Sequence, residues 1–403
     1  MKTGLFSFAA ATLLASTLSA GAVTLYQDSE TGAIYTKPGE GRVELGDFVR
    51  IEDRSGQEHG EFAKAGKKSG VTLKAKVATL KFGGKHYLGY LYSDDKTAAN
   101  EDESLFETRR NYFQVKAYWN KHDYMRLTLD TYQNAENDWA VRLKYAYIFL
   151  SDILPHTGVE FGQAHRSWID WEEHHGWWYR SISKTFIEDK HAADLTNSAD
   201  IGINFKTKTP FFSSEIGIYN GEGYHGKAQG NSMSYEWRLT YNVLGTGKRK
   251  VHMDDEYLDL SFTGQYEEKN YYKADPYGND FSKKRWWGIH AVYNRPELLI
   301  AGMYVDSSHS TYNKGKGCGT GYSLNGEFRP DAKWSILGRY DYWKTEQSAD
   351  AGAYADKEKS QYIAGVAYKY NKNVKFIGNI TSYDDTINKA KADNYMFTAE
   401  VSW

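Results

Sequence analysis

Residues 168–180 read WIDWEEHHGWWYR, so two glutamates, an aspartate and two adjacent histidines stand within thirteen residues. Carboxylates and imidazoles at close spacing are the groups from which metal sites and acid–base pairs are built. With His165 they could serve a surface metal-binding receptor or a hydrolase. The four tryptophans of the same stretch need an apolar surface to pack against. The stretch therefore has two interpretations, and the elements around it must decide between them.

The local sequence pattern weighs against a metal site or a catalytic site in this stretch. Neighbouring histidines in an extended segment point to opposite faces, and the spacing of His174 and His175 is not H-E-x-x-H. The nucleophile motif G-x-S-x-G does not occur. We therefore expect a protein that is not an enzyme and has no cofactor. A metal-binding receptor or an outer-membrane hydrolase that uses the 165–175 cluster is the alternative.

The two ends of the chain point to export and to a β-strand. Met1-Lys2 is followed by an apolar run and by Ala20-Gly21-Ala22, which predicts a secretory signal peptide over 1–22. At the other end, apolar and polar residues alternate strictly up to the terminal Trp403, as in a strand with one apolar face. Residues 23–70 are charged and rich in glycine, and we expect an N-terminal periplasmic segment over 23–85 that could contribute a strand.

The composition excludes several classes of protein. A net charge of −2 and the absence of a basic tract give no reason to expect nucleic-acid binding. Cys318 is the single cysteine, so no intrachain disulfide can stabilise this exported chain. Aromatic residues make up 16% of the sequence, and after the signal peptide no apolar run approaches the length of a membrane helix.

Apolar and polar residues alternate with period two in many segments, which predicts half-buried strands. Examples are 124–131, 139–147, 235–243, 258–266 and 334–342. In 139–147, for example, Trp139, Val141, Leu143, Tyr145 and Tyr147 should share the apolar face, opposite Arg142 and Lys144.

Short and long connections between these strands alternate along the chain, as in an antiparallel meander. The irregular member is 245–255, which is long for its place among the short turns. An open meander of this size would expose its edges and its apolar face, whereas a barrel closed in lipid exposes neither. We therefore predict an all-β, transmembrane, antiparallel up-and-down barrel over 86–403. Sixteen strands are expected, or eighteen if 71–82 and a strand near 42–50 join.

Several stretches are similar to a known family. Arg109-Arg110 opens a strand, the long loop carries Trp168-Ile169-Asp170 and Ser183-Lys184-Thr185-Phe186, and Asn220-Gly221-Glu222-Gly223 follows a hairpin. Together they resemble the phosphate-selective porin O and P-like family of Gram-negative outer-membrane porins, over about 105–403. The resemblance implies a sixteen-stranded, homotrimeric barrel that passes small hydrophilic solutes. It does not imply phosphate as the solute, because the family varies in selectivity and no defined cluster of phosphate-binding lysines can be matched.

The predicted lumen has candidate pore-lining residues on the wall and on the longest loop, 165–198. On three consecutive strands, basic residues form a stripe opposed only by Asp130, which favours anions. The loop is expected to fold inward as a constriction loop, with its tryptophans packed on the wall and its charges toward water or the opposite wall. The candidate residues are Arg110, Lys116, Arg126, Arg142, Lys144, Asp170, Glu172, Glu173, Arg180 and Lys184.

The expected function is passive diffusion of small hydrophilic solutes and ions through a bacterial outer membrane, with a preference for anions. The expected partners are outer-membrane lipid, lipopolysaccharide and two further copies of the chain. An aromatic-belt or subunit-contact role for the loop, and an adhesin or structural barrel with a plugged lumen, are further alternatives.

Overall fold

The computed structural model describes residues 23–29, 34–35, 37–48, 72–74, 78–97, 102–225, 233–245, 251–270 and 282–403. The predicted signal peptide, 1–22, lies outside the described residues. The chain divides into two compact units, Met1–Lys67 and Lys68–Trp403. The first holds a three-stranded antiparallel sheet in the order β2-β1-β3, formed by Val23–Asp28 (β1), Ile34–Tyr35 (β2) and Arg42–Phe48 (β3).

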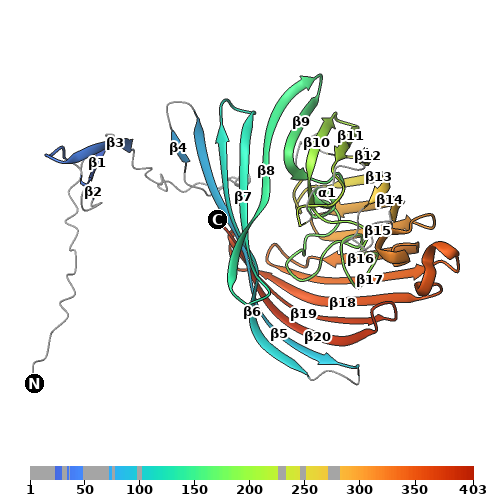
Figure 1. Cartoon of the computed structure of the whole chain (residues 1–403). Coiled ribbons are helices and arrows are strands. Elements are labelled where there is room, and N and C mark those ends of the chain that lie inside the picture. The colour runs from blue at the N-terminus through green and yellow to red at the C-terminus, as the bar shows by residue number, and fades with distance from the viewer. Residues whose placement is uncertain are drawn as a thin grey trace, which may run out of the picture. The chain divides into compact units, whose positions relative to one another are not determined.

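The second unit is a closed barrel of sixteen antiparallel strands, β5 to β20, each hydrogen-bonded to the next in sequence (Figure 1). The strands of its first half are Thr79–Asp95 (β5), Glu103–Tyr118 (β6), Tyr124–Gln133 (β7), Trp139–Leu154 (β8), Thr157–His165 (β9), Ala199–Lys208 (β10), Phe212–Tyr219 (β11) and Ser234–Leu244 (β12). Those of the second half are Tyr257–Asn270 (β13), Ser282–Arg295 (β14), Leu298–Asp306 (β15), Gly319–Phe328 (β16), Trp334–Thr345 (β17), Glu358–Lys369 (β18), Val374–Asp385 (β19) and Ala390–Ser402 (β20).

The prediction of sixteen strands is confirmed, and the eighteen-strand alternative is wrong. The segment near 42–50 provides β3, which pairs with β1 in the first unit. The short strand β4, Thr72–Lys74, pairs with the start of β5 only and does not enter the ring. The first barrel strand begins at Thr79, seven residues before the expected start at 86. That boundary was missed because Gly83-Gly84 interrupts the alternation that marks a strand.

The two terminal strands close the barrel. β20 pairs with β5 from Ala392↔Asp95 to Ser402↔Lys85. Beyond the last pair, Trp403 and Gly84 exchange backbone hydrogen bonds of 3.1 and 2.9 Å. A Cβ on Gly84 would lie 2.4 Å from the Trp403 indole, so the terminal tryptophan can pack across the seam only because position 84 has no side chain.

Three of the short turns share one chemical device. The first asparagine or aspartate of each turn accepts hydrogen bonds from the backbone N–H groups two and three residues later, as in an Asx turn. Asn120, Asp331 and Asn371 do so with distances between 2.7 and 2.9 Å. These hydrogen bonds within each turn explain why the short stretches NKHD (120–123), PDA (330–332) and NKN (371–373) are enough to reverse the chain.

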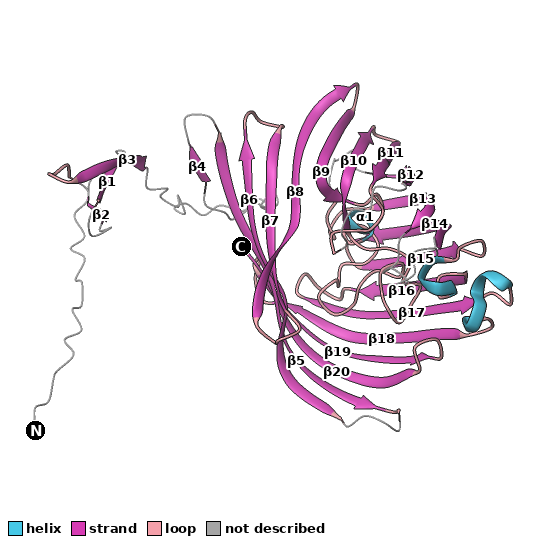
Figure 2. Ribbon diagram, viewed as in Figure 1, coloured by secondary structure: helices cyan, strands magenta, loops and turns pink. Residues whose placement is uncertain are grey.

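Long and short connections alternate along much of the barrel, but 134–138 and 386–389 are as short as the turns, and 245–256 is long for its place. The connections on the side of the longer loops are 96–102, 134–138, 166–198, 220–233, 271–281, 307–318, 346–357 and 386–389. They contain the short helix α1 (Ile169–Glu172) and the 3-10 segments η1 (Tyr312–Gly315) and η2 (Ala349–Tyr354) (Figure 2). Within the described residues, no helix has the length and apolar character needed to cross a membrane.

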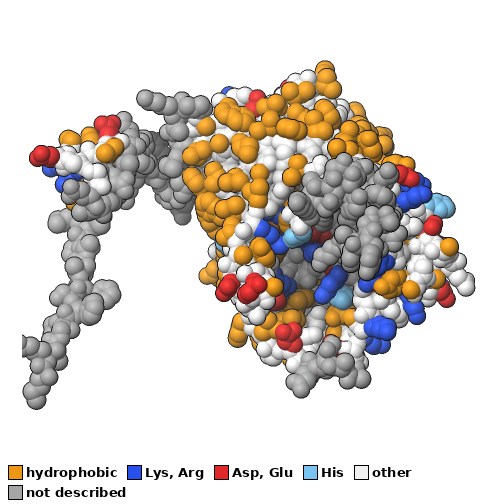
Figure 3. Space-filling model, in the orientation of Figure 1, with side chains coloured by type: hydrophobic (Ala, Val, Ile, Leu, Met, Phe, Trp, Pro, Cys, Tyr) orange, Lys and Arg blue, Asp and Glu red, His pale blue; other side chains and the backbone are white. Residues whose placement is uncertain are grey.

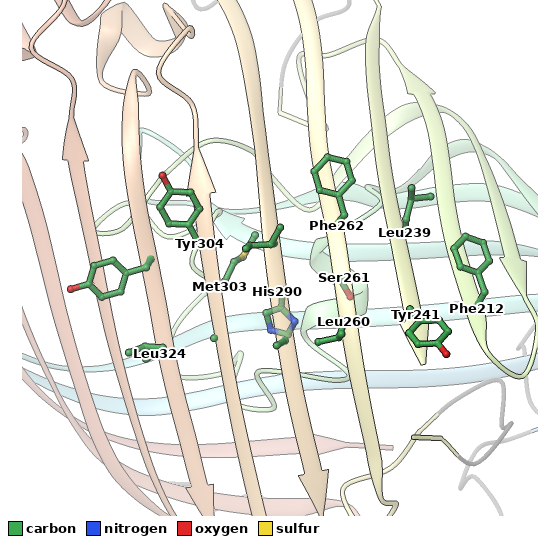
Figure 4. A pocket seen from close by; sticks show the side chains of 14 residues that line it. Phe212, Leu239, Tyr241, Leu260, Ser261, Phe262, His290, Met303, Tyr304 and Leu324 are labelled. Carbon is green, nitrogen blue, oxygen red and sulfur yellow. The ribbon is translucent and has the colours of Figure 1, made fainter. Parts of the chain in front are cut away.

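The strands turn an apolar face outward and a polar face inward. Along β12, Glu236, Arg238 and Thr240 are buried inside the barrel, while Leu239 and Tyr241 are exposed outside. Figure 4 shows part of the outer face, where Leu239, Phe262, Tyr304 and Leu324 belong to a shallow apolar groove. In the space-filling view, hydrophobic side chains cover the outer wall, and Lys, Arg and His side chains gather in the hollow (Figure 3).

Two β-bulges shift the predicted alternation. One lies in β8, where Thr128 pairs with Tyr145 and Leu129 with Leu143, so that Lys144 is the extra residue. The prediction that Tyr145 and Tyr147 face outward is therefore wrong: both rings are buried inside the barrel. A bulge puts two consecutive residues opposite one partner residue, which reverses the faces of everything beyond it. The other bulge lies in β6 at Arg109, between the pairs Leu88↔Thr108 and Tyr87↔Arg110.

Candidate pore constriction

The loop 166–198 folds into the barrel rather than away from it. Figures 1 and 2 show α1 and the rest of this loop within the ring of strands. Trp168 and Trp177 are each 2% exposed, although they stand in a connection between two strands. Such burial requires a partner surface inside the barrel, and two inner-wall patches provide it.

The first patch lies on β14 and β15. Trp168 and Trp171 meet the His290 ring edge-on, with centroids 5.1 and 5.5 Å apart. Beside them, inward-facing Leu299, Ala301, Met303 and Val305 of β15 form an apolar strip. The sequence LLIAGMYVD of β15 is apolar on both faces because one face meets the exterior and the other meets the loop. This continuous apolar run was the sequence signal that could have identified the packing wall.

The second patch lies on β17 to β19 and receives the other half of the loop. Trp177, Tyr179 and Ile182 form a cluster with four inward-facing apolar residues, Leu337, Ile363, Ala367 and Ile377. The loop is therefore seated against one side of the barrel by two separate apolar contacts.

The polar backbone of the loop is satisfied by donors from the wall. A segment without strand neighbours leaves its carbonyls unpaired, and buried carbonyls need donors. Six wall side chains from β6, β13, β16, β17, β18 and β19 donate to loop carbonyls over 2.6–3.2 Å. They are Arg109 to Ser181, Tyr257 to His175, Asn325 to Gly176, Arg339 to Lys184, Lys359 to Lys190 and Lys375 to Trp178.

The paired histidines of the loop belong to its backbone structure. Nδ1 of His174 lies 2.6 Å from the carbonyl oxygen of Asp170, and Nδ1 of His175 lies 2.8 Å from that of Trp171. His175 also stacks on the Trp171 ring with centroids 4.4 Å apart, and burial holds its pKa well below the ordinary value. Both rings thus complete the end of α1. Within the described ranges, no three His, Cys, Asp or Glu side chains are placed to hold a metal ion.

The charges of the loop pair mostly with one another. Arg180 binds Glu173 through Nε at 2.5 Å and Glu188 through Nη2 at 2.7 Å. Burial alone would raise the pKa of Glu188, but Arg180, Lys184 and two wall cations hold it below the ordinary value. Lys184 itself is 53% exposed and lies 3.7 Å from Glu188. Arg180 and Glu173 are thus held in fixed positions on the inner surface of the loop, and Lys184 reaches into open space.

Glu172 departs from the prediction that it faces water or the opposite wall. It is 4% exposed, and its Oε2 accepts a 2.6 Å hydrogen bond from Trp168 Nε1. Burial raises the pKa of this carboxyl to about 7, although Arg339 and the indole N–H both lower it. Glu172 was assigned wrongly because a four-residue helix turns it under the loop, which an extended segment would not do.

The basic residues of the predicted stripe lie on β6, β7 and β8. Arg110, Lys116, Arg126, Arg142 and Lys144 all face inward from β6, β7 and β8. Tyrosine rings lie beside them: the Arg110 guanidinium is 4.5 Å from the Tyr112 ring, and that of Arg126 is 4.5 Å from the Tyr145 ring. Stacking on tyrosine holds a guanidinium in place without neutralising it.

The stripe is not uniform. Arg142 binds Asp130 at 2.8 Å. Lys144 is only 1% exposed, because it donates to Ser198 of the loop over 2.5 Å and lies 3.4 Å from the Tyr224 ring. Lys144 therefore fastens the end of the loop to the wall, whereas Arg110 and Arg126 are bordered by tyrosine rings.

Sequence reasoning missed several lumenal groups. Arg109 faces inward beside Arg110 because of the bulge; it binds Glu107 at 2.8 Å and Thr398 at 2.7 Å. Lys206 lies between Glu160 and Glu215, at 3.4 and 3.2 Å. An Arg-Arg doublet in a strand was the signal for the bulge, because simple alternation would send one guanidinium outward.

The described end of the irregular connection, 251–256, also contacts side chains that face the lumen. Asn294 donates to the carbonyls of Met253 and Asp255 at 3.0 and 2.6 Å, and Arg329 donates to Met253 at 3.1 Å. Arg329 is in turn bound to Glu327 at 2.6 Å, and Glu327 accepts a hydrogen bond from the loop residue Tyr179. One ion pair therefore touches the inward loop and the irregular turn together.

No protein-family model and no curated protein sequence matches the chain. Solved structures match its fold. OmpF of Salmonella typhi in complex with daunomycin has a TM-score of 0.58 at 14% identity, over 83% of this chain and 100% of that one. The anion-selective porin from Comamonas acidovorans has a TM-score of 0.58 at 12% identity, over 81% and 100%. The trimer form of OmpT, an outer membrane protein of Vibrio cholerae, has a TM-score of 0.52 at 12% identity, over 81% and 100%.

A sequence identity of 12–14% supports a similar fold and nothing about function. The whole of each of these three chains is covered, so the likeness extends around the complete ring of strands. The chain therefore has the closed sixteen-stranded antiparallel barrel of Gram-negative outer-membrane porins.

Proposed function

We propose that this protein is an outer-membrane porin, a water-filled channel for passive diffusion of small hydrophilic solutes and ions. The observation that carries the proposal is the inward loop, which packs on one side of a charged lumen and leaves the Arg110–Arg126 side uncovered by its apolar contacts. A barrel of sixteen strands is wide enough for an aqueous path. Full plugging would need a loop that packs on every side.

The outer surface supports a membrane location. Leu239, Phe262 and Ile300 are exposed on neighbouring parts of the outer wall, where water would make such a patch unfavourable and lipid would not. In the proposal the short turns lie in the periplasm, the long loops face outward toward lipopolysaccharide, and the barrel forms a homotrimer after signal-peptide removal. The trimer form of OmpT, an outer membrane protein of Vibrio cholerae with a similar fold, is consistent with such an assembly.

The proposed constriction lies between the loop and the basic wall. Asp170 and Glu173 belong to the loop side, and Arg110 and Arg126 to the wall side. Arg180 of the loop interacts electrostatically with Arg110, so the two sides lie within Coulombic reach of each other. Opposite charges across a narrow, poorly screened passage produce a field that orients and selects ions.

An anion preference is the finer part of the proposal. On the loop-bearing side, lumenal cations are matched by carboxylates: Arg339 binds Asp341 at 2.6 Å, and Arg238 binds Glu215 at 3.2 Å. On the wall side, tyrosines hold Arg110 and Arg126 instead. Positive charge that is fixed but not neutralised attracts anions. We keep membership of the phosphate-selective porin O and P-like family as part of the proposal. We do not propose that the channel is specific for phosphate.

The proposal gives the 165–175 cluster no catalytic role. Nδ1 of His174 and of His175 is bound to the backbone of α1, which leaves only Nε2 of each ring for a ligand, and within the described residues no three His, Cys, Asp or Glu side chains are placed to hold a metal ion.

Planar-bilayer conductance tests the proposal. Refolded, heat-modifiable protein should give steady ohmic channels, and in a potassium chloride gradient the reversal potential should report a chloride-to-potassium permeability ratio above one. Replacing both wall arginines (Arg110→Gln with Arg126→Gln) should bring that ratio to one or below without closing the channel.

The matched control is Arg295→Gln, because Arg295 is exposed and pairs with Glu297 at the short-turn end. It should leave the ratio unchanged. Folded protein that gives no channels would refute the porin function and favour a plugged or adhesive barrel. Cation-selective wild-type channels would refute only the anion preference.

A further inference from the structure

His165 stands where the basic wall meets the inward loop. It is the last residue of β9, directly before the loop 166–198, and it is 5% exposed. Its ring packs against two tyrosines of β8, Tyr145 and Tyr147, with centroids 4.2 and 5.7 Å apart. Its backbone carbonyl accepts a 2.7 Å hydrogen bond from the hydroxyl of Tyr219 on β11. The imidazole therefore has a fixed position between wall and loop.

Two groups of opposite charge contact the same nitrogen of this ring. Nη1 of Arg126, on β7, lies 3.1 Å from Nε2, and Oδ1 of the loop residue Asp170 lies 3.4 Å from it. A guanidinium only donates hydrogen bonds, and an ionised carboxylate only accepts them. Nε2 therefore binds Arg126 when it carries a lone pair and Asp170 when it carries a proton, and it cannot bind both at once.

The neutral imidazole holds Arg126 on the wall. Its proton is then on Nδ1, which lies 3.9 Å from Glu160 Oε2. Arg126 also donates to the hydroxyls of Thr128 and Tyr147, at 3.1 and 3.3 Å, so the guanidinium lies along β7 and β8. In this state Nε2 offers no proton to Asp170, whose side chain is 35% exposed.

The other charges beside His165 are paired with one another. Glu160, also on β9, lies 3.4 Å from Lys206 of β10, and Lys206 lies 3.2 Å from Glu215 of β11. The guanidinium and the carboxylate at Nε2 are therefore the charges that a proton on His165 rearranges.

We infer that His165 is a specificity-determining residue of the channel, an inference that rests on the proposed porin function. A proton on Nε2 places two cations 3.1 Å apart, so Arg126 leaves the imidazole and turns toward the lumen. The same proton binds Asp170 through a charge-assisted hydrogen bond, which neutralises a carboxylate of the loop. Both changes make the passage more positive, so the preference for anions increases in acid.

Reversal potentials in a potassium chloride gradient at pH 8 and pH 5.5 test this inference. Ordinary imidazoles titrate between these two values, whereas ordinary carboxylates titrate at about pH 4. The chloride-to-potassium permeability ratio of wild type should increase at least about twofold from pH 8 to pH 5.5. His165→Gln should lose this increase, because glutamine does not titrate. Glu172 and the other histidines titrate in both proteins, so their contribution cancels in the comparison.

The matched control is His122→Gln, in the exposed short turn 120–123, which should retain the increase. His174→Gln tests a second imidazole near the same carboxylate, since His174 Nδ1 lies 3.7 Å from Asp170 Oδ1. Loss of the increase in His174→Gln together with its retention in His165→Gln would overturn the inference. A wild-type ratio that does not change with pH would overturn it as well.

A measurement without ion flow separates this inference from the proposed function. Nuclear magnetic resonance of the imidazole nitrogens, in folded wild type and His165→Gln in detergent micelles, identifies the His165 signal. The ring should change from one protonated nitrogen at pH 8 to two at pH 5.5. A ring that stays neutral overturns the inference whether or not the protein conducts. Folded protein with a titrating His165 and no channels refutes the porin function instead.

Discussion

Glu172 provides the sharpest quantitative prediction, because a carboxyl group is buried where the loop packs on the wall. It is 4% exposed, and its Oε2 accepts a hydrogen bond from the indole N–H of Trp168. Burial raises its pKa to about 7 from an ordinary value of 4.5. The change Glu172→Gln keeps the size of the side chain and an acceptor for that indole, and removes the titratable proton.

The magnitude follows from the two pKa values. Below pH 4.5 the carboxyl is protonated in both the folded and the unfolded chain. As the pH rises to 7, the unfolded chain releases its proton first, so the free energy of unfolding falls. Each pKa unit corresponds to about 1.4 kcal/mol, which gives a loss of about 3 kcal/mol between pH 4.5 and pH 7. The glutamine variant has no such loss.

The measurement is urea unfolding of protein refolded in lipid vesicles, followed by tryptophan fluorescence at pH 4.5 and pH 8.5. The stability difference between Glu172→Gln and wild type should increase by about 3 kcal/mol from the lower to the higher pH. His175, whose pKa is lowered by burial, makes both proteins less stable in acid and cancels in the difference.

Glu136→Gln is the control, since Glu136 is exposed in the connection 134–138. The free energy of unfolding of this variant should change with pH in the same way as that of wild type. Parallel profiles for Glu172→Gln as well would show that the carboxyl is not buried and that the loop does not pack as described.

Two further substitutions test the seating of the loop and the closure of the barrel. Trp168→Ala removes an indole from the β14–β15 patch, which should lower stability by about 3–5 kcal/mol and make the single-channel current larger and noisier; an unchanged current would mean that the loop does not narrow the path. Gly84→Ala places a Cβ 2.4 Å from the Trp403 indole, so the melting temperature should fall by an amount that corresponds to about 1–3 kcal/mol. Combining it with Trp403→Ala should remove most of that penalty, and full additivity of the two changes would contradict the predicted clash.

The sequence by itself determined the strands, their number and the alternation of short and long connections. These properties depend on residues near one another in the chain. A strand such as 235–243 shows its two faces because successive side chains point to opposite sides. A turn such as 120–123 reverses the chain because Asn120 binds the next N–H groups itself. The signal for a closed barrel was equally local: apolar faces repeated along the chain without a second layer to cover them.

Tertiary structure decided which way the side chains of the constriction face. The bulges at Arg109 and Lys144 exist because each strand must match the hydrogen bonds of its neighbours, and one extra residue sends Tyr145 and Tyr147 inward. Glu172 is buried because α1 turns it toward the wall that receives Trp168 and Trp171. WIDWEEHHGWWYR could show that its tryptophans needed a partner surface, but the two apolar patches lie more than a hundred residues away in the chain. Only the folded barrel brings them together, because such contacts are set by the closure of the ring and not by local spacing.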